Sequence, residues 1–138
     1  MPIKRNPEQH AALIAWGEAN PDTPVVLVNL LRFADRAHPG HRCDGMSGRE
    51  AYRAYGAALM ALDPPFPGTP IWHGRAGVDV IAPDGEHWDE VILVRYDSVD
   101  VFVEATSRPD YLEAAEKRTA ALDDARLVLS VETFRQGG

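Results

Sequence analysis

The chain has 138 residues, 45% of them apolar, which is enough for one domain with a sizeable core and too few for two. Its 14 lysines and arginines stand against 21 aspartates and glutamates, so the formal net charge is −7 and no basic cluster is present. This balance opposes binding to nucleic acid or to anionic lipid. We therefore expect a single domain over residues 1–138, with neither nucleic acid nor a membrane as a partner.

The cysteine content and the apolar segments of the chain indicate the cellular compartment in which we expect the protein. Cys43 is the only cysteine, so an intrachain disulfide is excluded and nothing points to an oxidising environment. The first residues, 1–16, contain two basic side chains but no apolar segment of signal-peptide length. No later run approaches the ~20 apolar residues of a membrane span. The predicted location is cytoplasmic.

Helix starts are marked by side chains that can accept hydrogen bonds from the free amides of a first turn. The predicted N-caps are Asn6, Ser47 and Ser98, and Gln9 and Glu50 stand where a capping box needs them. A fourth helical segment begins after Ser107-Arg108, at Pro109.

Four strands are predicted between these helices, at about residues 25–33, 71–81, 88–96 and 126–134. The middle two are joined through Pro83-Asp84-Gly85, which suits a short hairpin loop, so they should pair antiparallel. After the first helix the order is β-α-β-β-α-β, and right-handed crossovers place the helices on one face of the sheet. The predicted fold is therefore α+β and ferredoxin-like, a four-stranded antiparallel sheet with an extra N-terminal helix.

The strand segments Val25–Leu31 and Val91–Val94 are apolar at consecutive positions rather than at alternate ones. Both faces of the sheet should then be hydrophobic, although helices cover only one. A second copy of the chain is the expected cover. Two such sheets packed face to face would form a homodimeric α/β barrel.

Several segments resemble the domain of unknown function 1330 family. They are Val26–Phe33, the helix start Gly48–Gly56, Trp72-His73-Gly74, and Trp88–Ser98. The resemblance extends from about residue 25 to residue 129. It implies the dimeric α/β-barrel superfamily, which also contains cofactor-independent monooxygenases, muconolactone isomerases and haem-binding chlorite dismutases. It carries over no catalytic residues.

Two polar residues interrupt the first apolar strand, Asn29 and Arg32. A buried polar group costs on the order of 1–3 kcal/mol unless it is paired, so each needs a partner or a ligand. Their spacing of three places them on opposite faces of a regular strand. Either is a candidate ligand-binding residue; alternatively, Asn29 bonds to backbone and Arg32 pairs with a carboxylate such as Asp35, Asp89 or Glu90.

The second predicted strand offers His73, which is the candidate catalytic residue because histidine exchanges protons near neutral pH. The alternation places Trp72 and Gly74 on one side and His73 and Arg75 on the other. We expect the Trp72 side to meet the helices and His73 to face the barrel interior or, at a sheet edge, solvent.

Tyr52 and Tyr55 share one face of the second helix with Leu59 and Leu62. Their hydroxyls could line a pocket at the end of the first strand, and both are candidate ligand-binding residues. The alternative for such a stripe is ordinary core packing.

The long connection 34–46 contains four potential metal ligands, His38, His41, Cys43 and Asp44. Their spacing matches no established zinc pattern, so neither a metal nor another cofactor is predicted. The alternatives for this segment are a solvated loop or a mobile lid over a pocket.

Three functional interpretations follow. The first is a small dimeric protein that binds an apolar or aromatic metabolite and acts on it as a cofactor-independent oxygenase or isomerase. The second is a non-catalytic ligand-binding or stress-related dimer. The third is haem binding, for which His38, His41, His73 or His87 would supply an axial ligand.

Overall fold

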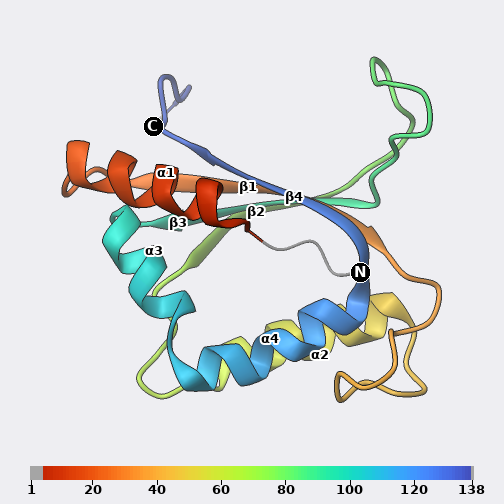
Figure 1. Ribbon diagram of the computed structural model, residues 1–138. Helices are drawn as coiled ribbons and strands as arrows, with labels where there is room; N and C mark the ends of the chain where they lie inside the picture. Colours follow the sequence, from red (N-terminus) through yellow and green to blue (C-terminus); the bar gives the residue numbers. More distant parts are fainter. Residues whose placement is uncertain (1–4, 138) are drawn as a thin grey trace.

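The computed structural model describes residues 5–137 and confirms the predicted ferredoxin-like architecture (Figure 1). The elements in chain order are α1 (Pro7–Ala19), β1 (Val25–Phe33), α2 (Gly48–Met60), β2 (Thr69–Arg75), β3 (Glu90–Tyr96), α3 (Val99–Thr106), α4 (Pro109–Ala121) and β4 (Leu122–Ser130). The four strands form one antiparallel sheet in the order β2-β3-β1-β4. The two long strands β1 and β4 thus pair with each other, and β2 lies at an edge.

The predicted caps are present. Asn6 Oδ1 accepts a hydrogen bond from the amide of Gln9 at 2.8 Å, and Gln9 Oε1 accepts one from the amide of Asn6 at 3.0 Å. Ser47 and Glu50 form the same reciprocal box at the start of α2, and the Ser98 hydroxyl accepts from an amide of α3. Each cap satisfies amides that a first helical turn leaves free.

Two predicted boundaries differ from the structure. The strands of the hairpin are shorter than expected, because residues 76–89 leave the sheet as a projecting arm (Figure 1). The last strand, expected at about residues 126–134, is β4 (Leu122–Ser130) and begins earlier, directly after α4. The Asp123 carboxylate lies beside the His38 imidazole, and the Asp124 carboxylate pairs with the Arg126 guanidinium.

The core lies between the sheet and the helices. Val25, Leu27 and Leu31 of β1 point into it and are at most 4% exposed. The core consists of two clusters of side chains. Leu31 packs with residues of α2 and α4, whereas Val25 and Leu27 pack with residues of α1 and α3. Figure 1 shows α2 and α4 side by side on one side of the sheet, with the 76–89 arm projecting on the other side.

The opposite face of the sheet carries no helix among the described residues, 5–137. Register places a group of apolar side chains on it, namely Val26, Val28, Leu30, Trp72, Val91, Leu93 and Val128. Most are half-buried, whereas Trp72 is 53% exposed and Val128 is 56% exposed. We call this group the open face. Within one chain, β1 is thus fully buried only on its helix side.

Candidate functional site

A continuous row of aromatic rings crosses the space between the sheet and the helices. Its members in spatial order are Phe33, Tyr52, Tyr55, Tyr111, Phe66, Tyr96 and Phe102, with successive ring centroids 5.0–6.5 Å apart. These rings come from β1, α2, α4, β3, α3 and the α2–β2 connection. Such spacings are typical of favourable edge-to-face and stacked pairs. We call this set the aromatic row.

Side chains beside the aromatic row remain accessible. Val94 lies on an inner strand and points toward the helices, yet it is only half-buried. Tyr52, Tyr111 and Arg118 are half-buried as well. A well-packed interior would bury such positions fully, so α2 and α4 do not fully enclose these side chains.

The tyrosine hydroxyls are neutral donors and acceptors. The hydroxyls of Tyr55 and Tyr111 are hydrogen-bonded at 3.1 Å. Burial raises the pKa of Tyr52, raises that of Tyr96, and raises that of Tyr55 well above the ordinary value. Low dielectric disfavours the phenolate, so these groups keep their protons at neutral pH.

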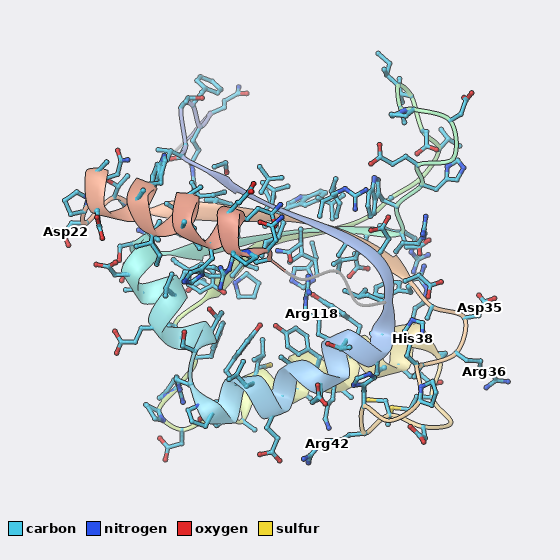
Figure 2. All side chains as sticks on the ribbon, in the orientation of Figure 1. Asp22, Asp35, Arg36, His38, Arg42 and Arg118 are labelled. Carbon is cyan, nitrogen blue, oxygen red and sulfur yellow. The ribbon has the colours of Figure 1, made fainter. Side chains whose placement is uncertain are left out.

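Arg118 is the cation whose charge acts on these hydroxyls. Figure 2 shows its side chain rising from α4 into the space between α4 and the sheet. Its positive charge acts on the pKa of Tyr52, Tyr55 and Tyr96, in each case opposing the effect of burial. Among residues 5–137, no carboxylate forms a salt bridge with Arg118.

Asn29 lies on the helix side of β1 and is 8% exposed. Its side-chain amide donates to the carbonyls of Leu27 and Ile92 at 3.4 and 3.3 Å. These bonds match the backbone-bonding alternative given for this residue. These bonds explain the burial of Asn29 without a ligand, and ligand binding by Asn29 stays a prediction.

Arg32 lies on the other side of the sheet from Asn29, as its spacing predicted. Register pairs it with Asp124 of β4, and the guanidinium and carboxylate are 3.9 Å apart. Arg32 therefore belongs to the border of the open face. Its carboxylate partner is thus not Asp35, Asp89 or Glu90 as expected, and the sheet separates Arg32 from Tyr52 and Tyr55 on the helix side.

His73 is exposed on the edge strand β2, and register pairs it with the buried Ile92. Directly paired residues point to the same face of a sheet, so His73 faces the helix side and Trp72 the open face. This reverses the orientation expected from the alternation. The reason is that residues 76–81, which suggested an apolar helix-facing side, are not part of the strand.

The connection between β1 and α2 is anchored rather than free. The His38 amide donates to Ala120 O at 2.8 Å, and the imidazole Nε2 lies 3.1 Å from Leu122 O and 3.0 Å from an Asp123 oxygen. His41 contacts Glu116, and Cys43 is buried in the core at 1% exposure. This contact pattern disfavours a mobile lid.

The remaining histidine of the haem interpretation, His87, lies in the 76–89 arm and contacts Asp79. Residues 5–137 contain no group of three or more histidine, cysteine, aspartate or glutamate side chains placed to hold a metal ion.

A shallow hollow of about 260 Å³ lies at the carboxyl end of β1. It is lined by Phe33, Ala34, Asp35, Ser47, Arg49 and Asp89. The Asp89 carboxylate in this hollow is already hydrogen-bonded to the protein, because its Oδ2 accepts a hydrogen bond from the amide of Phe33 at 2.9 Å. Arg49 stacks over the Phe33 ring at 4.8 Å. The hollow adjoins one end of the aromatic row through that ring.

The chain is similar along nearly its whole length to the RPA0582 protein of unknown function from Rhodopseudomonas palustris, with 33% identity over 96% of this chain and 98% of that one and a TM-score of 0.81. The chain belongs to the family of the RPA0582 protein. Neither a family model nor a curated protein matches the chain. The resemblance to the domain of unknown function 1330 family therefore stays a prediction.

More distant structures share the fold alone. A dimeric protein of unknown function with a ferredoxin-like fold from Bacteroides fragilis is 14% identical, covers 79% of this chain and 96% of its own, and has a TM-score of 0.50. A hydroxynitrile lyase from Passiflora edulis is 16% identical, covers 83% of this chain and 100% of its own, and has a TM-score of 0.55. No helix within residues 5–137 has the length and apolarity needed to cross a membrane.

Sequence reasoning missed Arg118 and the full extent of the aromatic row. Arg118 follows Tyr111 by seven residues and Ala114 by four, so it lies on the same stripe of α4. This spacing is the sequence signal that indicates the position of Arg118 beside Tyr111. Leu112, the residue after Tyr111, lies on the other side of α4 and is 55% exposed.

Proposed function

We propose that this protein binds a small aromatic metabolite between the sheet and the α2–α4 pair. The observation that carries the proposal is the aromatic row, because seven linked rings beside accessible apolar surface suit a flat apolar ligand. Tyr52 and Tyr55, the predicted ligand-binding residues, contribute two of these rings. The polar atoms beside the aromatic row are mainly tyrosine hydroxyls, which can orient a ligand through hydrogen bonds without burying a charge.

Catalysis on the bound metabolite is part of this proposal, as a cofactor-independent oxygenase or isomerase. The fold is shared with an enzyme named as a hydroxynitrile lyase, which supports its compatibility with catalysis. His73 is the proposed base, since it faces the helix side from the edge strand. The alternative is a binding protein without turnover. Oxygen consumption or isomer formation with an aromatic substrate, lost in His73→Gln, distinguishes the two.

We also propose that the working unit is a homodimer formed through the open face. Its apolar side chains are too exposed for an isolated sheet, and a second copy would cover them. The 76–89 arm projects on the same side and exposes Val78, Val80 and Ile81 by 89–96%. These aliphatic side chains could pack against the second copy. A dimeric protein of the same fold supports this arrangement.

The binding proposal is tested with benzamide, a neutral aromatic probe, by calorimetry or ligand-observed NMR. Tyr52→Leu removes one ring and its hydroxyl from the aromatic row and should weaken binding about fivefold to tenfold. Leu112→Ala, on the exposed side of α4, is the matched control and should leave the affinity unchanged. Equal binding by both variants would contradict this location, and no binding to the parent protein would overturn the proposal.

A further inference from the structure

Hydrogen-bond donors outnumber acceptors around the aromatic row. Arg118 brings a guanidinium, which has donors only. In the Tyr55–Tyr111 pair one hydroxyl donates to the other at 3.1 Å, so the second hydroxyl proton is left for another partner. Tyr52 adds a further hydroxyl. A ligand that offers several acceptors in one place would satisfy this set.

The charge of Arg118 is not neutralised by a direct partner. No carboxylate of residues 5–137 lies within 4.0 Å of its guanidinium nitrogens, which is also true of the exposed Arg5, Arg36, Arg49, Arg53 and Arg75. Arg118 is half-buried between α4 and the sheet. A guanidinium in this position is available to bind an anionic group of a ligand.

The other charged side chains that face this space leave its net charge positive. Glu90 is a carboxylate that points to the helix side. Its negative charge adds to the effect of burial in raising the pKa of Tyr52. Register places Arg75 of β2 directly opposite Glu90 on the neighbouring strand. The two side chains form no salt bridge, although opposite charges on paired strands attract each other. Two cations, Arg75 and Arg118, therefore face this space against one carboxylate.

We infer that the natural ligand is an aromatic acid, whose carboxylate is held by Arg118 with the hydroxyls of Tyr52 and the Tyr55–Tyr111 pair, and whose ring lies along the aromatic row. This inference rests on the proposed function and narrows its ligand class. The planar guanidinium matches a carboxylate through two parallel hydrogen bonds. The adjacent rings supply stacking surface for a flat apolar body.

The test compares benzoate with benzamide, which have the same ring and nearly the same shape but differ in charge. Both are titrated at neutral pH and fixed ionic strength into the parent protein and three variants. Arg118→Met removes the charge and keeps an apolar side chain, and Arg118→Lys keeps the charge without the planar fork. Arg53→Met, on the exposed side of α2, removes the same charge elsewhere and is the matched control.

The parent protein should bind benzoate about tenfold more tightly than benzamide. Arg118→Met should abolish that preference and leave benzamide binding within about twofold, whereas Arg118→Lys should retain part of it. Arg53→Met should change neither affinity. Thermal melts confirm that each variant is folded.

Equal affinity for the two probes, unaffected by Arg118→Met, would overturn the inference while leaving the proposed function intact. A benzoate preference lost equally in Arg53→Met would also overturn it, because the effect would then reflect net charge rather than this contact. Failure of both probes to bind the parent protein would overturn the proposed function together with the inference.

Discussion

Asn29 and Arg32 show how two polar residues of one apolar strand can have different roles. Asn29 points into the core and bonds to two backbone carbonyls, so its polarity is satisfied locally. Arg32 points to the open face and approaches Asp124, with side-chain exposures of 40% and 19%. Their opposite orientation followed from the period of two in a strand. Their partners depended on strand register, which the sequence does not reveal.

Arg32→Ala should cost only about 1 kcal/mol or less of unfolding free energy. Asp124 would not be stranded, because it keeps an Arg126 guanidinium at 2.7 Å and the Ala125 amide at 2.8 Å. Benzamide affinity should be unchanged, since Arg32 lies on the other side of the sheet from the aromatic row. Denaturant melts and titrations measure both quantities. A loss of about 3–5 kcal/mol would show a tightly buried pair instead.

The buried tyrosines should make the protein sensitive to alkali. Burial raises the pKa of Tyr52, Tyr55 and Tyr96, whereas in the unfolded chain each ionises near about pH 10. Above that pH the unfolded state binds fewer protons than the folded state, so the free energy of unfolding falls as pH rises. The slope is about 1.4 kcal/mol per pH unit for each tyrosine that stays protonated.

Denaturant melts from neutral pH to about pH 11 test this dependence. Tyr55→Phe removes one titrating group and should make the fall shallower. An unchanged slope in Tyr55→Phe would show that this hydroxyl ionises in the folded protein as it does in the unfolded one.

At the scale of elements, the end of β1, the start of α2 and the end of α4 meet at Gly48. Its amide donates to Ala34 O at 3.1 Å, and the amide of Ala34 donates to Ala121 O at 2.9 Å. A Cβ at Gly48 would overlap Ala34 O and lie 2.7 Å from Ala121 O. Both are backbone atoms, so the elements themselves would have to move.

Gly48→Ala should therefore lower the free energy of unfolding by about 3 kcal/mol. A Cβ added at Gly56, in the same helix, would meet no atom within 4 Å, so Gly56→Ala is the control and should stabilise the protein by about 0.5–1 kcal/mol. Chemical denaturation measures both changes. A neutral Gly48→Ala would mean that this junction is loosely packed.

Elements with local signals were predictable, whereas contacts between distant elements were not. The capping boxes at Asn6 and Ser47 depend on residues three positions apart and were predicted correctly. The side on which His73 lies depends on where β2 stops and on the register shift between Pro70 and Trp72. Arg118 could not be distinguished from a solvated helix residue until the tyrosines were placed around it.

At the scale of the whole molecule, the open face should control assembly. Val28 is central on that face, since it pairs with Leu93 on one side and Val128 on the other. In the proposed homodimer, Val28→Glu would bury an unpaired carboxylate at the interface and should produce monomers. Leu112→Glu, on the exposed side of α4, should leave the dimer intact.

Light scattering at micromolar concentration measures the outcome directly. The parent protein and Leu112→Glu should both have twice the mass of the chain, and Val28→Glu should have the mass of one chain. A folded parent protein with the mass of one chain would refute the dimer proposal.

The two faces of the sheet are thus assigned different tasks, binding of a metabolite on the helix side and association with a second copy on the open face. Amide chemical-shift mapping of isotope-labelled protein titrated with benzamide tests this division of tasks. We expect the largest shifts on α2, α4 and the helix-facing positions of β3, around Tyr52, Tyr111 and Val94. Shifts concentrated instead at Val26, Val28 and Leu93 would place the ligand on the open face and contradict the assignment of the two faces.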